Sequence, residues 1–289
     1  MTDENATLVE RIELDTTLVI FRIRPDRVPA EGLPWFLAGQ YVTIGMEGVQ
    51  RAYSIASSPD ERRWLEFYIR YARDPATDSP LTHLLFKVPA GGRLHIGEKL
   101  AGRFTLERTA AGDGRAKLFV AAGTGLAPFV SMVRRALAVG DADALARMRV
   151  LHGVSHPHEL GYREILEDAA ARFGLRYFPT VSRAAENPAW GGLTGRVETL
   201  LDTGRLDDLD LRPEATMVYV CGFKNTIAGA VLRLLSRGYV PEDRRLRRMA
   251  GIPDDLKPSL FFEQYDLEPL FDPKKADALK GRSPHATKE

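Results

Sequence analysis

Short, mostly apolar stretches recur through the first third of the chain, and their residue types favour β-strands. The stretches are rich in β-branched and aromatic residues and lie between Pro, Gly and Asp residues, as in a small barrel. One helix is expected in this part, and a Pro-Ala-Gly-Gly segment at 89–92 would end it. The expected strands are 18–23, 41–44 and 64–71, and the expected helix is 80–87.

A polar, glycine-rich stretch at 110–115 marks a change of pattern. After it, short apolar runs alternate with segments of helical spacing, which predicts a parallel sheet with helices on both faces. We therefore expect an antiparallel β-barrel domain over 1–110, a doubly wound α/β domain over 115–272, and a flexible tail over 273–289. The expected strands are 117–122, 147–154, 177–181 and 217–221, and the helices that follow them are 127–139, 163–172, 196–201 and 225–237.

Composition narrows the class of protein. The 289 residues include 40 basic and 39 acidic side chains, a balance that gives no bulk attraction to nucleic acid or membranes. The single cysteine, Cys221, excludes an internal disulfide and a cysteine-ligated iron–sulfur cluster. Residues 1–13 carry acids and lack the apolar segment of a secretory signal, and no run reaches the roughly 18 apolar residues of a spanning helix. We expect a cytoplasmic protein.

Arg51-Ala52-Tyr53-Ser54 alternates along an expected strand, so Arg51 and Tyr53 share one face and Ser54 points to the other. A guanidinium can grip phosphate oxygens in a bidentate manner, a tyrosine ring can cover a flavin, and a hydroxyl can reach the flavin N5 edge. An ordinary amphipathic strand with an exposed arginine explains the segment equally well.

Gly123-Thr124-Gly125 follows a buried strand and opens a helix, where Pro128 suits the first turn. Glycines let the backbone approach a phosphate, and the helix N-terminus supplies N–H donors for it. The alternative is a tight strand–helix connection with no ligand, because the acidic ribose-binding residue of the usual dinucleotide fingerprint is not evident downstream.

Two further strands carry candidate chemistry. Cys221 ends an apolar run at the sheet edge where ligands bind in open parallel sheets, although a buried, inert cysteine is the plainer interpretation. The segment 260–266 is an aromatic strand in which Tyr265 could stack on a flavin and Glu263 could relay a proton, or it is simply the last core strand.

Two charged or metal-ligating segments have mainly structural interpretations. His156 and His158 flank a proline, and a polar turn explains them better than a metal site does, so no metal is expected. The basic run 244–248 is either a solvated face or a docking site for an acidic electron carrier.

Taken in order, these segments resemble the ferredoxin/flavodoxin–NADP reductase family, closest to its bacterial members, over about residues 5–266. The resemblance implies that the barrel binds FAD and the α/β domain binds NADP. It places Ser54, Cys221 and Glu263 around the hydride-transfer point. It assigns to FAD the residues Arg51, Ala52, Tyr53, Ser54, Tyr68, Pro80, Leu81, Thr82, Thr124 and Tyr265, and to NADP the residues Gly123, Gly125, Ser182, Arg183, Arg196, Gly222, Phe223 and Lys224.

The function that the resemblance implies is electron transfer between NADPH and a separate ferredoxin or flavodoxin, by a monomer. Two alternatives stay open: the reductase component of an oxygenase or cytochrome P450 system, and a flavin-binding module without turnover. The chain departs from the family where Ser155 replaces a nucleotide-binding arginine, and where it continues for more than twenty residues past Tyr265.

Overall fold

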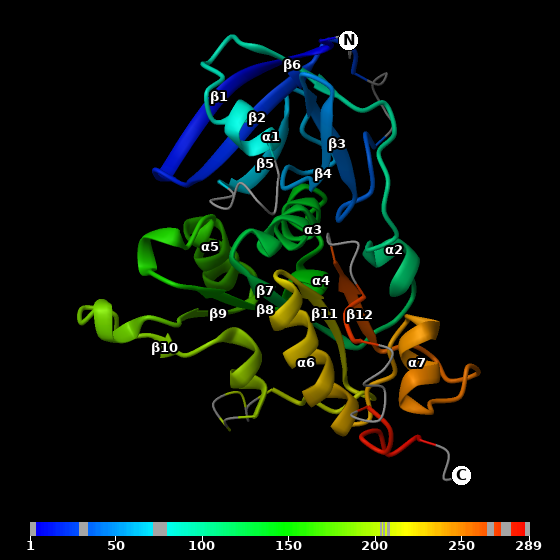
Figure 1. Cartoon of the computed structure of the whole chain (residues 1–289). Coiled ribbons are helices and arrows are strands. Elements are labelled where there is room, and N and C mark those ends of the chain that lie inside the picture. The colour runs from blue at the N-terminus through cyan, green and yellow to red at the C-terminus, as the bar shows by residue number, and fades with distance from the viewer. Residues whose placement is uncertain are drawn as a thin grey trace. The chain divides into compact units, whose positions relative to one another are not determined.

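The computed structural model divides the chain into two compact units (Figure 1). It describes residues 4–28, 34–71, 80–202, 204, 206, 209–264, 269–272 and 279–286. The first unit comprises Met1–Gly112, Ala127–Leu145 and Gly161–Arg163, and the second comprises Asp113–Leu126, Ala146–Leu160 and Glu164–Glu289. Each unit contains one sheet and its own apolar core, so we describe the two separately.

The first unit is built on a six-stranded antiparallel sheet in the order β4-β3-β6-β1-β2-β5. The two strands that end this order, β4 and β5, are in contact, so the sheet curls on itself as the predicted barrel requires. Its elements are β1 (Ala6–Asp15), β2 (Leu18–Pro25), β3 (Tyr41–Met46), β4 (Val49–Ser54), β5 (Leu65–Arg70), β6 (Arg93–Ile96), α1 (Pro80–Leu85), α2 (Leu106–Thr109), α3 (Ala127–Ala138) and most of α4 (Ala142–Ala146).

The core of this unit follows from the two-residue period of its strands. Along β2, Val19, Phe21 and Ile23 point inward and are almost fully buried. Leu65, Phe67 and Ile69 repeat the pattern on β5, which pairs with β2. The predicted strands 18–23, 41–44 and 64–71 correspond to β2, β3 and β5, whereas β1 and β6 were not anticipated from the sequence.

The second unit is built on a six-stranded parallel sheet in the order β10-β9-β8-β7-β11-β12. The predicted doubly wound α/β architecture is confirmed. Its elements are β7 (Ala116–Ala122), β8 (Met148–Val154), β9 (Arg176–Val181), β10 (Leu193–Thr194), β11 (Thr216–Cys221), β12 (Leu260–Glu263), α5 (Arg163–Phe173), α6 (Lys224–Ser236), α7 (Arg244–Ala250), and the 3-10 turns η1 (Gly123–Leu126), η2 (Pro157–Glu159), η3 (Ala184–Glu186) and η4 (Val197–Asp202).

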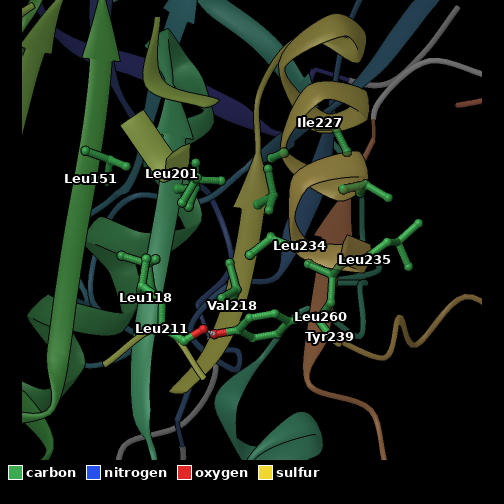
Figure 2. Close-up of a cluster of buried hydrophobic side chains, with 14 of the residues drawn as sticks. Leu118, Leu151, Leu201, Leu211, Val218, Ile227, Leu234, Leu235, Tyr239 and Leu260 are labelled. Atoms are coloured by element: carbon green, nitrogen blue, oxygen red, sulfur yellow. Dashed lines mark hydrogen bonds between the residues drawn. The ribbon is translucent and has the colours of Figure 1, made fainter. Parts of the chain in front are cut away.

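Both faces of the central strands β7 and β11 are buried, which explains their unbroken apolar sequences. One face packs against α6 and η4 through leucines and valines such as Leu118 and Val218 (Figure 2). The other face carries an aromatic row, in which Tyr219 meets Phe119 edge-on at 5.7 Å and stacks on Phe261 at 4.9 Å. Burying each such side chain contributes about 1.5–3 kcal/mol to stability.

Two expectations about the second unit need correction. The helix expected at 196–201 is the 3-10 turn η4, which begins shortly after Gly195 at φ 112°. The tail expected at 273–289 lies partly outside the described residues. Its described part, 279–286, is packed rather than loose, because Leu279 is 1% exposed within the leucine-rich core and His285 contacts the carbonyl oxygen of Gly238.

Within the described residues, none of the helices combines the length and the apolar character that crossing a membrane would require.

Candidate functional site

The order of the parallel sheet reverses between β7 and β11, because β8 to β10 extend from one side of this pair and β12 from the other. In sheets of this kind, ligands bind beside the carboxyl ends of the strands at such a switch point. The sequence brings two glycine-containing segments to this place: Gly123 directly follows β7, and Gly222 directly follows β11.

The turn after β7 fits tightly over the end of β11. A Cβ placed on Gly125 would lie 2.3 Å from the carbonyl oxygen of Cys221 and 2.7 Å from the backbone nitrogen of Gly222. Gly222 itself has φ 152°, and a Cβ there would lie 2.8 Å from the Cβ of Ala122. Only glycine satisfies these contacts, so the packing accounts for both glycines without reference to a ligand.

The same turn nevertheless leaves an approachable surface. Gly123 has φ 54°, and the nearest side-chain atom to its missing Cβ is the ring of Phe223, at 3.7 Å. Phe223 is 62% exposed, and Lys224 opens α6 beside it. A turn in which Gly123 leaves the backbone approachable, bordered by an exposed ring and a lysine, fits the pyrophosphate of a dinucleotide.

Cys221 and Glu263 lie side by side at the carboxyl edge of the sheet. They are register partners in the parallel pair β11–β12, and Cys221 also pairs with Ala121 of β7. Cys221 is fully buried, whereas Glu263 is half-buried. The structure therefore brings together two of the three predicted catalytic residues. Ser54 belongs to the first unit, and Tyr265 lies outside the described residues.

The predicted contacts to the 2′-phosphate of NADP follow the ends of β9 and β10. Ser182 and Arg183 are exposed, and their backbone N–H groups donate to Val154 and Ser155 across the sheet edge. Arg196 follows β10 and is also exposed. Each arginine has a carboxylate beside it: Glu186 lies 3.5 Å from Arg183, and Glu198 lies 2.6 Å from Arg196. Neither carboxylate was identified from the sequence.

In the first unit, the predicted flavin strand is the edge strand β4. Arg51 and Ala52 are exposed, Tyr53 is half-buried against the barrel core, and Ser54 is buried. The Arg51 guanidinium donates to the carbonyl oxygen of Gln50 at 2.8 Å. An exposed guanidinium next to a partly exposed tyrosine fits the phosphate and ring of a flavin nucleotide.

The remaining predicted flavin residues are more enclosed. Leu81 and Thr82 are buried in α1, which begins at Pro80. Tyr68 is 3% exposed, and its hydroxyl accepts a hydrogen bond from the Gly161 N–H at 3.3 Å. Its ring also meets Tyr162 edge-on at 5.4 Å. Only a small part of the Tyr68 surface is therefore open to a ligand.

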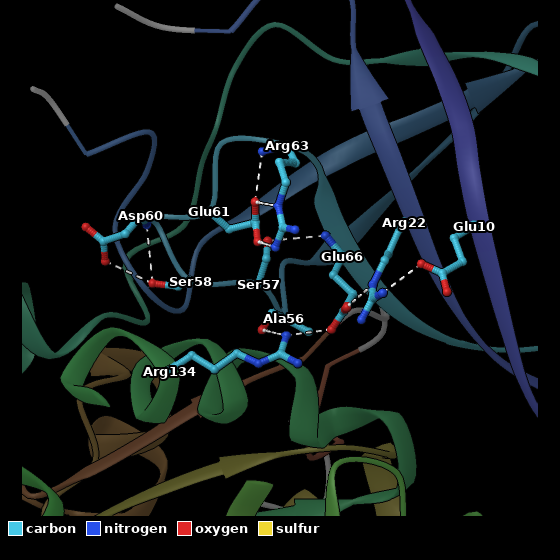
Figure 3. A network of polar contacts seen from close by, with 10 residues as sticks. All are labelled: Glu10, Arg22, Ala56, Ser57, Ser58, Asp60, Glu61, Arg63, Glu66 and Arg134. Atoms are coloured by element: carbon cyan, nitrogen blue, oxygen red, sulfur yellow. Dashed lines mark hydrogen bonds and ion pairs between the residues drawn. The ribbon is translucent and has the colours of Figure 1, made fainter. Parts of the chain in front are cut away.

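A buried carboxylate organises the polar contacts of the first unit (Figure 3). Glu66 on β5 is 1% exposed and pairs with Arg22 at 2.7 Å through one oxygen and with Arg134 of α3 at 2.5 Å through the other. Arg134 also donates to the carbonyl oxygen of Ala56, and the Ser131 hydroxyl donates to the carbonyl oxygen of Ser57. These contacts fix α3, the helix that continues directly from η1, against the segment after β4.

His152 on β8 is a buried titratable group beside the glycine turn. It is fully buried in register with Ala121, and its Nδ1 lies 3.3 Å from the Tyr177 hydroxyl. Burial lowers the pKa of His152 to about 4, and a hydrogen bond to the backbone of Gly123 partly offsets that effect. The imidazole is therefore neutral at physiological pH.

The histidine pair and the basic run resolve into local structure. His156 and His158 lie on either side of Pro157 at the start of η2, and their rings stack at 5.5 Å. In the basic run, Arg247 is 3% exposed and donates to the carbonyl oxygens of Pro241, Asp254 and Leu256. Arg244 and Arg245 are exposed, as is Arg248.

Comparison with known proteins places these features in a family. A model of the oxidoreductase NAD-binding domain matches residues 119–231. A flavodoxin/ferredoxin–NADP reductase of Shigella flexneri is 30% identical over 204 residues, which cover 68% of this chain and 77% of the relative. The reductase subunit of an aromatic O-demethylase of Amycolatopsis is 32% identical over 195 residues, covering 66% of this chain and 54% of the relative.

A solved structure supports the same assignment at the level of the fold. It is a ferredoxin NADP⁺ reductase from Neisseria gonorrhoeae with bound FAD and NADP, which matches with a TM-score of 0.73 and 24% identity over 90% of this chain and 97% of its own. The resemblance inferred from the sequence motifs is thereby confirmed. This chain is an oxidoreductase and belongs to the flavodoxin/ferredoxin–NADP reductase family.

Proposed function

We propose that this protein transfers electrons between NADPH and a separate one-electron carrier protein, with FAD as its bound cofactor. The observation that supports the proposal is the glycine turn at the sheet's switch point, where Gly123 has φ 54° and the nearest atom to its missing Cβ is in the ring of Phe223, 3.7 Å away, so that a phosphate can approach its backbone. Phe223, Lys224, Ser182, Arg183 and Arg196 lie along the same carboxyl edge and are proposed to hold the nucleotide.

The chemistry that FAD supplies when bound is the exchange of a two-electron hydride for single electrons. The chain's own residues position the reactants. Arg51 binds phosphate, Tyr53 covers the flavin, and Leu81 and Thr82 shape the wall beside it. Thr124 and Cys221 are proposed to lie beside the nicotinamide, and the Glu263 side chain is proposed to relay a proton. The Ser54 hydroxyl is proposed to donate a hydrogen bond at the N5 edge of the flavin. Tyr265 is proposed to shield the flavin until the nucleotide enters.

NADPH is the proposed nucleotide rather than NADH. Arg183 and Arg196 follow neighbouring strands, and a guanidinium favours a 2′-phosphate by charge. Ser155 stands where bacterial relatives carry an arginine, so the preference should be weaker than in those relatives.

The proposed partner is an acidic ferredoxin or flavodoxin. Arg244, Arg245 and Arg248 expose positive charge on α7, whose first turn is capped by Asp243 through a hydrogen bond from the Leu246 N–H. Complementary charge of this kind mainly accelerates association, so the reduction rate should fall as salt concentration rises. We further propose a monomer in the cytoplasm.

A reductase component of an oxygenase or cytochrome P450 system is the second candidate, which the Amycolatopsis relative favours. The two candidates share all chemistry up to the flavin and differ only in the acceptor. Rates of NADPH-dependent reduction of purified ferredoxin, flavodoxin and an oxygenase component separate them. A chain that binds FAD but reduces no acceptor would instead be a binding module.

Flavin binding is tested with Arg51→Ala. Loss of a charge-assisted phosphate contact costs roughly 1.5–3 kcal/mol, so FAD should dissociate from the variant about 10- to 150-fold more readily. Titrating the FAD-free protein and following flavin fluorescence measures this constant. Arg27→Ala removes another exposed arginine of the first unit and serves as the control. Equal FAD affinity in Arg51→Ala and the parent would show that β4 does not bind the phosphate.

A further inference from the structure

A carboxylate stands where the proposed function expects only cations. Arg183 lies just after β9, and η3 then turns the chain so that Glu186 returns to it. One oxygen of Glu186 lies 3.5 Å from Arg183 Nη1, and the other lies 3.8 Å from His156 Nε2. Both side chains of the ion pair are more than half exposed, so the pair is open to an incoming ligand.

Asn187 orients this cluster. Its Nδ2 donates to the carbonyl oxygen of Arg183 at 2.7 Å and lies 3.0 Å from His156 Nδ1. Because a carbonyl oxygen can only accept, the amide nitrogen must face it, and the same nitrogen then donates to Nδ1. In the neutral imidazole, the proton therefore sits on Nε2, which faces Glu186. Glu186 therefore lies between a cation and an imidazole N–H group.

The two arginines proposed for the 2′-phosphate differ in how firmly their carboxylates are held. Glu198, the partner of Arg196, has a side chain only 8% exposed and is part of the packed η4 turn. Glu186 has a side chain 57% exposed. An exposed ion pair of this kind is weak, typically between zero and about 1 kcal/mol, so a ligand can displace Glu186 readily.

Nucleotide-binding folds use opposite charges for the two ribose types: an acid accepts a hydrogen bond from the 2′-hydroxyl of NAD, and an arginine accommodates the 2′-phosphate of NADP. In this chain an acid, Glu186, and an arginine, Arg183, are in contact with each other. We propose that Glu186 is a specificity-determining residue that limits the preference for NADPH over NADH. This inference rests on the proposed function.

The physical reason lies in the charges that each ribose brings. A 2′-phosphate must displace Glu186 from Arg183 and then bind with that carboxylate still nearby, where like charges repel. A 2′-hydroxyl can donate to Glu186 while the ion pair stays intact. Removing the negative charge should therefore favour the phosphate and not the hydroxyl.

The test is a charge series at position 186, measured by calorimetric titration with 2′-phospho-AMP and with AMP. In Glu186→Gln, the ratio of the two affinities should shift toward 2′-phospho-AMP by about three- to tenfold, and in Glu186→Lys it should shift further. The kcat/KM ratio for NADPH over NADH should move in the same direction. Glu214→Gln serves as the control and should leave both ratios unchanged. It removes a charge just before β11 begins, at the end of the strand opposite the proposed nucleotide site.

Each result decides the question. Affinity ratios within about twofold of the parent in both position-186 variants would overturn the role of Glu186 while leaving the proposed function intact. A parent protein that binds neither 2′-phospho-AMP, AMP nor NADP⁺ would overturn the proposed function and this inference together.

Discussion

At the scale of single residues, burial decides which titratable groups bear on stability and which bear on binding. Arg183, Arg196 and Arg51 are exposed, whereas Arg247 and Glu66 are buried among their own partners. Sequence type alone does not make this distinction. The run Arg-Arg-Leu-Arg-Arg contains four chemically equal side chains, and Arg247 is the one that turns inward onto three carbonyl oxygens.

His152 should make folding pH-dependent. Its pKa of about 4 in the folded protein lies below the value of about 6.5 of an unfolded chain, so the unfolded state binds more protons between these values. The stabilising contribution is therefore present above about pH 6.5 and is lost as pH falls toward about 4. Between about pH 6.5 and 5 the free energy of unfolding should drop by about 1.5 kcal/mol.

Urea unfolding of the parent and of His152→Gln across this pH range measures the effect. The variant should lose the part of the slope that His152 causes, even if it is less stable throughout. Leu151→Val, the control, removes a methylene group from the neighbouring buried position and should lower stability at every pH with the slope retained. A slope that persists in His152→Gln would assign the titration to another group.

At the scale of elements, the glycine turn and the buried carboxylate perform different tasks. The turn packs its Gly125 against the backbone at the end of β11, whereas Glu66 ties β5 and β2 to α3. The first is a matter of steric exclusion by backbone atoms, and the second is a matter of paired charges within a low-dielectric interior. Substitutions in the glycine turn and at Glu66 therefore test the steric contact and the ion pairs separately.

Gly125→Ala should damage the nucleotide site. Its Cβ would meet the backbone of Cys221 and Gly222 at 2.3–2.7 Å, and backbone atoms cannot rotate away. We expect a loss of about 1–3 kcal/mol in stability together with weaker NADP⁺ binding, because the turn must shift. Gly114→Ala, where nothing lies within 4 Å, is the matched control and should change stability by less than about 1 kcal/mol. Calorimetric titration with NADP⁺ and thermal unfolding of both variants decide the matter; unchanged binding in Gly125→Ala would count against the site.

Glu66→Ala should destabilise the first unit by about 3 kcal/mol, because two arginines lose a buried partner. Glu10→Ala provides the comparison within the same network. Glu10 contacts Arg22 from a side chain that is 47% exposed, so its loss should cost no more than about 1 kcal/mol. Urea unfolding curves give the change in the free energy of unfolding for both variants. Similar losses in the two variants would mean that burial does not control the strength of these pairs.

Elements whose signals are local could be predicted from the sequence. The apolar run and glycines around β7 indicated a strand, a tight turn and a helix, and the structure confirms all three. β1 and β6 escaped prediction because polar residues interrupt them and because β6 pairs with strands far along the chain. The same limit applies to Glu66 and Arg134, which are 68 residues apart and meet only through the fold. Glu186 was not singled out because its contact with Arg183 depends on a turn that returns it to that residue.

At the scale of the whole molecule, the chain comprises an antiparallel barrel unit and a parallel-sheet unit, each of which has its own set of candidate ligand-binding residues. The C-terminal segment 279–286 contributes to the core of the second unit. Leu279 packs in the leucine-rich core, so truncation after Asp266 would remove part of that core together with the residues adjacent to the proposed flavin shield. Replacement of Tyr265 itself is therefore the cleaner way to study that shield.

We propose above all that this chain takes electrons from NADPH onto bound FAD. An anaerobic titration of the FAD-loaded protein with NADPH, followed by its visible absorption spectrum, tests this most directly. The yellow flavin band should bleach in proportion to added NADPH and return when an electron acceptor is supplied. A flavin band that persists in excess NADPH, or a chain that does not take up FAD at all, would contradict it.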